Sequence, residues 1–318
     1  MKTLGATVSG RVRTGAESVF RESVAALHSD RRNAALPNIA ATFAVIAGLI
    51  YLLLRYPNPW TYALAFVGIG LMQYRIVVAC HEAVHKALLY PLWLNETVGS
   101  IHCVLVGINL LWYRLQHLGH HAARDVEHDL DGYIYAPILR ARPGLRRIGV
   151  WILGTGFEVI EKLRQKGFTV SATVDAKGLA RFYSLAIVAV QATLLIVCSL
   201  WLAWWYYFAF WLGPLLTIAI FMNRTRVLVE HGSAHVPRLD SSALASEPAQ
   251  AIDVSAGFLG RFFMAPYMIN YHFSHHRVPT IPYHRVPDLS QLLQKRGETP
   301  PHPMRPSYSQ ALWLLLWN

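Results

Sequence analysis

The chain has 318 residues, of which 54% are hydrophobic and only 15% are charged, and its mean hydropathy is +0.30. Soluble domains are about a quarter charged, so this composition excludes disorder, a coiled coil and an ordinary soluble enzyme. Ten tryptophans and fifteen tyrosines favour an integral membrane protein with interfacial aromatic residues. We attribute the net charge of +11 to Lys and Arg that flank membrane spans, and expect no nucleic-acid partner.

The chain divides into three predicted parts. Residues 1–33 are polar and basic and contain no apolar segment, so we expect a cytoplasmic N-terminal arm without a cleavable signal peptide. Residues 34–295 form the predicted membrane domain, and residues 296–318 a C-terminal tail.

Four membrane spans are predicted from uncharged segments. Residues 34–54 form 21 uncharged positions, long enough to cross a bilayer. After a proline-containing turn, residues 60–80 form the second span, with Arg75 expected near the headgroups. The 41 uncharged residues from 182 to 222 are twice the length of one span and predict a hairpin that turns at its central cluster of Trp and Tyr.

The segment 97–113 is ambiguous, because its 17 uncharged residues are at the short limit for a span. We predict an interfacial or re-entrant helix there, since four spans in two hairpins then bring every histidine cluster to one face. Of the 29 Lys and Arg, only Arg55 falls in a predicted outer loop. The positive-inside rule therefore places that face in the cytoplasm. The predicted fold is all-α, with a cytosolic helical cap that carries the histidines.

Ten of the fifteen histidines fall in four clusters whose members are spaced to share one helix face. Imidazole suits iron, zinc, copper and nickel, but not magnesium or calcium. Ten imidazoles exceed what one metal can use, and two metals with about five nitrogen ligands each would absorb them. The clusters are His81-Glu82-x-x-His85, His117-x-x-His120-His121, Glu230-His231-x-x-x-His235 and His272-x-x-His275-His276.

The remaining histidines have other expected roles. His28 and His302 lie in polar stretches and should be solvated, whereas His102 on an apolar run should be a satisfied buried residue. His128 is expected to support the site or lie at the surface, and His284 to have a structural role.

One alternative is an intramembrane zinc metalloprotease, because His81-Glu82-x-x-His85 is also the HExxH motif. Residues 130–132 (Leu-Asp-Gly) resemble an element of such proteases. That function would leave both HxxHH clusters without a role. A metal transporter is a weaker alternative, because transport ligands should lie at the bilayer midplane.

At these clusters the sequence resembles the membrane fatty acid desaturase superfamily, which also contains alkane hydroxylases and carotenoid ketolases and hydroxylases. The resemblance covers roughly residues 35–295. It implies four transmembrane helices in two hairpins under a cytosolic cap with a histidine-ligated di-iron centre. It also implies a multi-pass protein of the bacterial cytoplasmic membrane, with the active site on the cytoplasmic side.

The resemblance implies a set of iron ligands. In the third cluster, Arg226-x-x-x-Glu230-His231 resembles many bacterial acyl desaturases and favours His231. The spacing to His235 resembles acyl-CoA desaturases, so both residues stay candidates. The other implied ligands are His81, His85, His117, His120, His121, His272, His275 and His276.

The reaction implied by the resemblance uses two iron ions, O2 and two electrons to remove hydrogen from an unactivated C–H bond. We expect introduction of a double bond into a fatty acyl chain; the alternative in this class is a hydroxylase or ketolase of a lipid, alkane or carotenoid. Glu82, Asp125 and Glu230 are candidates for orienting imidazole N–H groups.

The electrons must come from a separate partner. The chain has no haem-attachment motif, no CxxC pair and no GxGxxG fingerprint. We therefore expect a ferredoxin, rubredoxin or cytochrome-type donor with its reductase, docked on the basic face. Two interpretations stay open for a group of arginines: they bind a phosphate or carrier headgroup, or they only contribute to the positive charge of the cytoplasmic side. The group is Arg140, Arg142, Arg146 and Arg147.

Overall fold

The computed structural model is helical throughout the part of the chain that it describes, which is residues 4–123, 128–164, 174–235, 251–299 and 305–318. Within these ranges the only strand-like features are two isolated bridges, Asp253 with Tyr271 and Ser255 with Ser307. The predicted all-α class is therefore confirmed.

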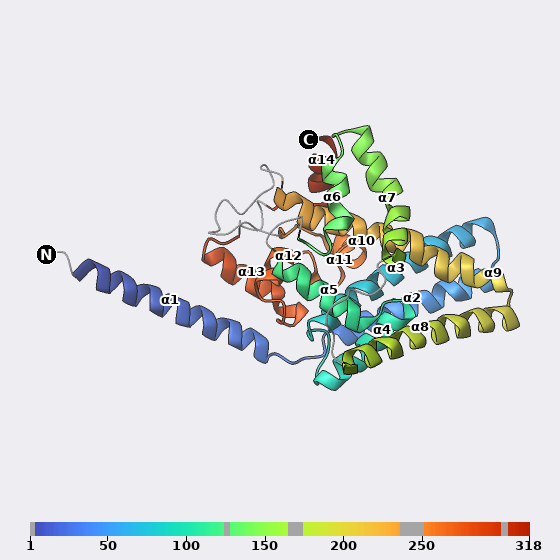
Figure 1. The fold of residues 1–318 in the computed structure, drawn as a ribbon, viewed down its shortest axis with the longest axis horizontal. Coiled ribbons are helices and arrows are strands. Elements are labelled where there is room, and N and C mark those ends of the chain that lie inside the picture. The colour runs from blue at the N-terminus through green and yellow to red at the C-terminus, as the bar shows by residue number, and fades with distance from the viewer. Residues whose placement is uncertain (1–3, 124–127, 165–173, 236–250, 300–304) are drawn as a thin grey trace.

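The helices fall into long apolar ones and short ones that hold the histidines (Figure 1). In chain order the α-helices are α1 (Leu4–Ser29), α2 (Ala35–Arg55), α3 (Pro59–Val84), α4 (Leu92–Leu105), α5 (Leu110–Ala122), α6 (Gly132–Arg140), α7 (Leu145–Arg164), α8 (Val174–Trp201), α9 (Trp204–Tyr207), α10 (Ile220–Val227), α11 (Phe258–Phe263), α12 (His272–Arg277), α13 (Val286–Lys295) and α14 (Tyr308–Trp317). Short π and 3₁₀ turns are η1 (Phe208–Leu212), η2 (Leu215–Ala219), η3 (Leu228–Gly232), η4 (Ser233–His235), η6 (Pro266–Met268) and η7 (Tyr283–Arg285).

Four described helices are long and apolar enough to cross a membrane, and they match the four predicted spans. The first two are α2 and α3, joined by a short turn. Asn58 caps α3 by accepting hydrogen bonds from the backbone N–H groups of Trp60 (2.9 Å) and Thr61 (3.2 Å), with Pro59 at the first helical position.

The other two spans are 176–201 in α8 and the continuous run 204–232 from α9 to η3. They turn at residues 202–203, within the predicted cluster of tryptophans and tyrosines. The last helix continues ten residues beyond the predicted end at residue 222. As a consequence, Glu230 and His231 lie on the same helical rod as the span, in the π-turn η3.

The predicted interfacial or re-entrant segment is a pair of helices, α4 and α5, bent by 100° at residues 106–109. The broken ends have partners from the neighbouring span. Gln191 of α8 donates to the carbonyls of Val104 (3.3 Å) and Leu105 (3.0 Å), while Asn109 caps α5 and donates to the Ala180 carbonyl (2.8 Å). Half-buried side-chain partners of this kind satisfy backbone groups that a break in a helix leaves open.

Arg75, expected near the headgroups, is enclosed by protein and only 1% exposed. Its guanidinium donates to Thr42 Oγ1 (3.0 Å), Asn38 Oδ1 (3.3 Å) and the Phe262 carbonyl (2.6 Å), and lies 4.2 Å from the Phe262 ring centroid. A charge on an apolar helix is tolerated here because these groups replace its water.

Candidate metal centre

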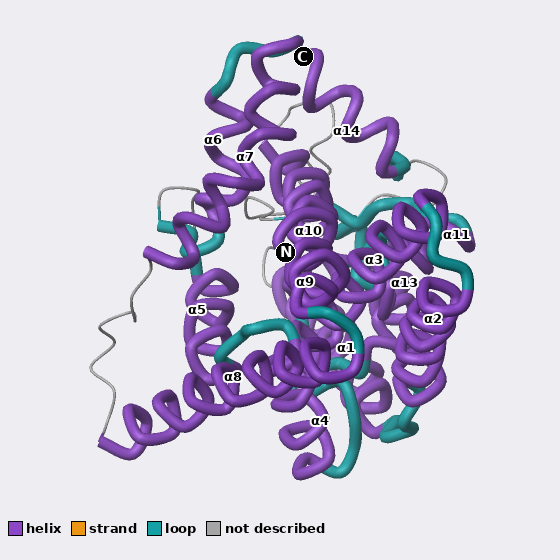
Figure 2. The backbone as a smooth tube through the Cα atoms, turned by 90° about the vertical axis from the view of Figure 1, so that its right-hand side faces the viewer, coloured by secondary structure: helices purple, strands orange, loops and turns teal. Residues whose placement is uncertain are grey.

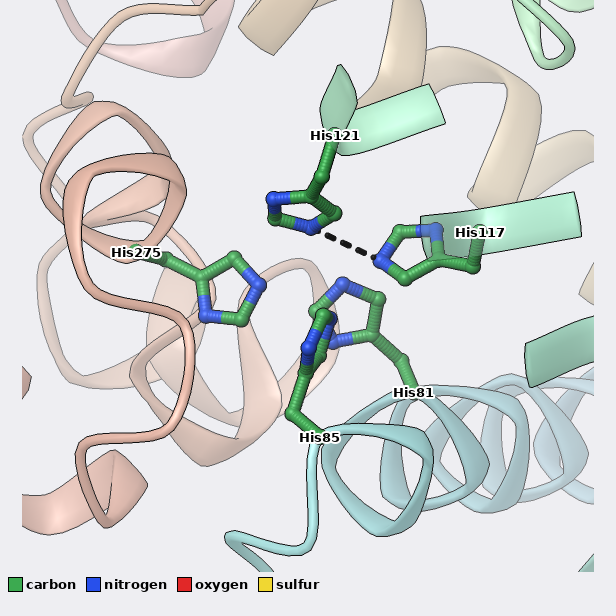
Figure 3. A group of neighbouring side chains, drawn as sticks. All are labelled: His81, His85, His117, His121 and His275. Atoms are coloured by element: carbon green, nitrogen blue, oxygen red, sulfur yellow. Dashed lines mark hydrogen bonds between the residues drawn. The ribbon is translucent and has the colours of Figure 1, made fainter. Parts of the chain in front are cut away.

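Five histidines converge from three helical segments that are far apart in the sequence. One ring nitrogen from each can be chosen so that all five lie within 4.8 Å of one another. Figure 3 shows the five rings pointing towards a common centre. α3 supplies His81 and, at its C-cap, His85; α5 supplies His117 and His121; α12 supplies His275.

A second group lies directly beside the first. It consists of His120 from α5, His231 from η3, and His272 and His276 from α12, again within 4.8 Å. The rings of His121 and His276, one from each group, stack with centroids 4.0 Å apart. Helices α5 and α12 therefore each supply both groups, which makes the two groups one continuous site.

Close contacts between ring nitrogens have the spacing of metal ligands. His117 Nε2 lies 3.1 Å from His121 Nε2, and His231 Nε2 lies 2.8 Å from His272 Nε2. Two nitrogens that lie about 2.1 Å from one ion and at right angles to each other are about 3.0 Å apart. Both groups therefore fit an ion bound by imidazole nitrogen.

Four carboxylates contact the Nδ1 atoms of four different histidines. The Nδ1–oxygen distance is 2.9 Å from His81 to Glu82 and 2.5 Å from His120 to Asp129. It is 3.5 Å from His117 to Asp131 and from His272 to Glu230. In His81, His120 and His117 the contact is a hydrogen bond, and a proton held on Nδ1 leaves Nε2 as the lone-pair atom that faces the centre of each group.

Glu230 also links the site to the C-terminal helix. Its Oε1 accepts a 2.6 Å hydrogen bond from the hydroxyl of Tyr308 on α14, and its Oε2 pairs with Arg226 one turn earlier. Glu230 is fully buried, so the guanidinium offsets a carboxylate charge that would otherwise be costly. The two contacts fix a carboxylate that lies 3.5 Å from His272 Nδ1.

Several ring nitrogens have no protein partner even though they are buried. Within the described residues this holds for Nε2 of His81, His85 and His275, and for Nδ1 of His121. Burial lowers the pKa of His85 to about 3 and holds the pKa of His272 and His275 well below the usual value. Neutral imidazoles with unpartnered buried nitrogens fit metal ligands, because binding requires the deprotonated ring.

Helix α12 is held in place by a buried carboxylate behind it. Asp253 accepts hydrogen bonds from the backbone N–H of Ser274 (3.0 Å), the Ser274 hydroxyl (2.7 Å) and the Ser290 hydroxyl (2.6 Å), and lies 3.5 Å from Arg305. These contacts tie α12 to α13 and to the segment before α14. The three histidines of α12 are thus carried by a rigid element.

A cavity of about 270 Å³ opens onto both histidine groups. His81 and His117 of the first group line it, as do His120, His231 and His272 of the second. Its remaining wall combines apolar residues with polar ones; these include Val77, Trp112, Ile134, Asn109, Gln116 and Asn223. A substrate in this cavity would lie against both groups at once.

The structure brings together nine of the ten predicted histidines. The side chain of His235 and all of Asp125 lie outside the described residues, as does His302. Asp129 and Asp131 were not predicted, although their positions shortly after the second cluster were a usable signal.

The histidines outside the two groups have mostly local roles. His102 is 3% exposed with Nδ1 2.7 Å from the Val98 carbonyl, so it is buried as predicted, while its Nε2 has no hydrogen-bond partner among the described residues. His284 lies 3.3 Å from Asp30, and His128 is exposed. His28 is partly exposed, and its Nε2 lies 3.2 Å from the Thr280 hydroxyl.

The predicted arginine cluster is split by the structure. Arg147 is buried and donates to the carbonyls of Leu139, Ala141 and Leu315, so it clasps α6, α7 and α14 together. It is not available to a phosphate. Arg140, Arg142 and Arg146 remain exposed.

Four long apolar helices and two adjoining groups of buried histidines define an integral membrane protein with a site able to hold two metal ions. The chain belongs to the fatty acid desaturase family, whose model matches residues 57–308. This family indicates an oxidoreductase with a lipid substrate. No curated protein matches the sequence.

Proposed function

We propose that the protein is an O2-dependent di-iron oxidoreductase that introduces a double bond into a fatty acyl chain. The observation that carries the proposal is the pair of adjoining histidine groups, each with four or five ring nitrogens within 4.8 Å. Membership of the fatty acid desaturase family supports the same reaction class.

The first iron would be held by His81, His85, His117, His121 and His275, and the second by His120, His231, His272 and His276. Bound iron supplies oxidation of an unactivated C–H bond by O2. The protein fixes the ligands: Glu82, Asp129 and Asp131 hold protons on Nδ1 of His81, His120 and His117 and keep Nε2 directed inward.

The cavity beside both groups would hold the reacting carbons. Val77, Ile134 and Val227 give it apolar wall, and the two histidine groups form one side. Excluding water there lets one C–C segment lie against the metals without competing hydrolysis or proton exchange. Whether the product is an alkene or an alcohol then depends on how that segment is placed.

The zinc protease alternative finds less support in the geometry. His81 and His85 do not stand alone, because three further histidines lie within the same 4.8 Å group. Glu82 Oε1 is engaged with the ring of His81, at 2.9 Å, whereas an HExxH protease uses this carboxylate as a general base towards water.

The proposal includes a membrane setting and a partner. The four spans would form two hairpins in a bacterial cytoplasmic membrane, with the histidines on the cytoplasmic side. A ferredoxin, rubredoxin or cytochrome-type donor would deliver electrons to that side. The net charge of +11 supports an acidic carrier, since opposite charge steers association.

Purification and turnover test the proposal. The purified protein should contain about two irons per chain and little zinc. Oxidation of a membrane lipid or acyl substrate should require both O2 and a reduced carrier, with the unsaturated product identified by mass spectrometry. An activity that persists without O2 or reductant would contradict the proposal, and a hydroxylated product would replace desaturation by hydroxylation.

A further inference from the structure

A second cavity, of about 610 Å³, lies between α6, α7 and α10, away from the histidines. Its wall is mainly apolar, with Val150, Leu153, Phe157 and Ile160 on α7 and Pro137 on α6. Its volume is more than twice that of the cavity at the histidine groups. No step proposed above uses it.

The helix that forms most of this cavity has an apolar face exposed in the structure. Leu153 and Phe157 of α7 are 71% and 75% exposed, and Leu145 at its start is 79% exposed. Figure 1 and Figure 2 show α7 running across the direction of α3 and α10 rather than along it. α7 also contacts η2, inside the fourth span. An amphipathic helix in this position would lie in the membrane interface, where lipid would cover such a face.

The two cavities share a wall. Tyr133, on α6, lines both of them. Helix α10 also borders both cavities: its Arg224 lines the large cavity, whereas its Asn223 and Arg226 line the histidine cavity. Tyr133 is half-buried at the start of α6. A chain that passed this side chain would move directly from the large cavity to the metal site.

The charged groups give the large cavity a polar end. Among the described residues, its lining contains Arg146, Arg224 and Glu158, which leaves one net positive charge. Arg224 is 3.5 Å from Glu158 and packs against Gly154, where a Cβ atom would come 2.1 Å from its Nη2. That pair is fixed and buried, so the exposed Arg146 is the cation placed to meet an anionic group at the surface.

We propose that this cavity is the entrance for the substrate: it takes the hydrocarbon chain of an anionic acyl lipid from the bilayer and passes it by Tyr133 to the histidine cavity. The anionic end of the lipid stays at Arg146. The inference rests on the proposed function, because it makes the bound chain the substrate of that site.

Two glycines of α7 provide a matched test. A Cβ atom at Gly149, which lines the cavity, or at Gly156, which does not, would meet no atom within 4 Å. Gly149→Phe should therefore fill the cavity without disturbing the fold, and Gly156→Phe carries the same change on the same helix. The probe is a photoreactive diazirine fatty acid in vesicles with the full-length protein, and labelled peptides are mapped by mass spectrometry.

Wild-type protein and Gly156→Phe should be labelled within residues 145–160. Gly149→Phe should lose this labelling about ten-fold, the effect expected from displacing roughly two buried methylene groups. It should lose turnover to a similar extent and keep its full iron content. Undiminished labelling of these residues in Gly149→Phe, or wild-type labelling confined to other helices, would overturn the proposal.

The anionic end is tested with the carboxylate probe and its methyl ester. Wild-type protein and Arg261→Ala, an exposed arginine outside the cavity, should label more strongly with the carboxylate, and Arg146→Ala should lose this preference. A preference that survives in Arg146→Ala would overturn the assignment of the polar end. Specific labelling without any oxidation of the probe would leave the cavity assignment standing and contradict the proposed function instead.

Discussion

Each imidazole of the site has two nitrogens, and only one of them can face a metal. The histidines differ in whether a protein group contacts the nitrogen that faces away from the centre. His81 and His120 direct Nδ1 to Glu82 and Asp129, whereas His275 sits with Nε2 unpartnered in the described protein. A ring held on one side by a carboxylate is also a better ligand, since the contact fixes its tautomer and raises its basicity.

Replacing His275 tests whether the HExxH cluster and the two HxxHH clusters contribute to one metal centre. His275→Ala should abolish activity and lower the iron content, because the five-membered group loses one ligand while span hydrophobicity is unchanged. Iron is measured by elemental analysis on protein purified from the membrane. His28→Ala, which belongs to neither group, should retain activity and iron.

The opposite outcome has a definite meaning. Near-normal activity and full metal content in His275→Ala would show that His81 and His85 bind metal without the C-terminal cluster. The zinc protease alternative would then regain support.

Asp129 should matter although it faces away from the metals. Asp129→Asn keeps a hydrogen-bond acceptor for His120 Nδ1 but removes the charge, so we expect a loss of about 10–100-fold in iron affinity or activity. Competition with an iron chelator measures the affinity. Asp288→Asn, at a half-buried pair with Arg285, is the control; an equal loss there would count against a local role for Asp129.

At the scale of residues, spacing in the sequence predicts well which histidines meet in the site. It predicts only in part which carboxylates contact them. Positions three and four apart on a helix share a face, which is why both HxxHH clusters converge as expected. Glu82 and Glu230 are adjacent to a histidine and could be chosen. Asp129 reaches His120 from beyond the end of α5, and no periodicity relates residues across such a connection.

At the scale of helices, apolar runs locate the spans but not the limits of the helices, and the span that begins at residue 176 starts six residues before its uncharged run. The run after residue 182 stops at Met222, yet the helix continues to Gly232. Arg224, Arg226 and Glu230 end the apolar run but not the helix, because each is buried against a protein partner rather than exposed to lipid. An uncharged run of sequence marks the part of a helix that contacts lipid. The helix itself continues wherever its backbone hydrogen bonds are made.

Close packing of α3 against the fourth span depends on Gly70. A Cβ atom there would lie 2.5 Å from Ile218 Cβ and 3.1 Å from the Pro214 carbonyl oxygen. Gly70→Leu should destabilise the protein by about 1–3 kcal/mol through overpacking and displace the helix that carries His81. Thermal unfolding in detergent, followed by tryptophan fluorescence, measures the change.

Gly48 is the matched control on α2, because a Cβ atom there meets nothing within 4 Å. Gly48→Leu should leave the unfolding temperature and the iron content unchanged. Equal destabilisation by both substitutions would show that the effect comes from leucine in a span, not from the contact with Ile218.

At the scale of the molecule, the site requires α3, α5, η3 and α12 to meet on one side of the membrane. The bend of 100° between α4 and α5 allows this, because a straight helix over the same residues would separate the ends of the two histidine-bearing segments. Hydropathy alone leaves four or five spans open. The convergence of the histidines supports four.

Cysteine accessibility tests this topology. We predict that residues 1–33, 114–180 and 224–318 face the cytoplasm. In a background with Cys198→Ser, the exposed Tyr56→Cys should react with an impermeant reagent added outside, and the exposed His128→Cys should react only after the membrane is opened. Outside labelling at position 128 would mean that α4 and α5 cross the membrane together.

The order in which the histidines leave the ribosome has a consequence for metal loading. Both groups need α12, and 191 residues separate His85 from His276. At about 5–20 residues per second, about 10 to 40 seconds pass between the synthesis of these two residues. During this interval neither histidine group is complete, and an isolated pair or triplet of imidazoles suits several metals besides the proposed iron. Selection of the correct metal therefore belongs to the finished, inserted protein.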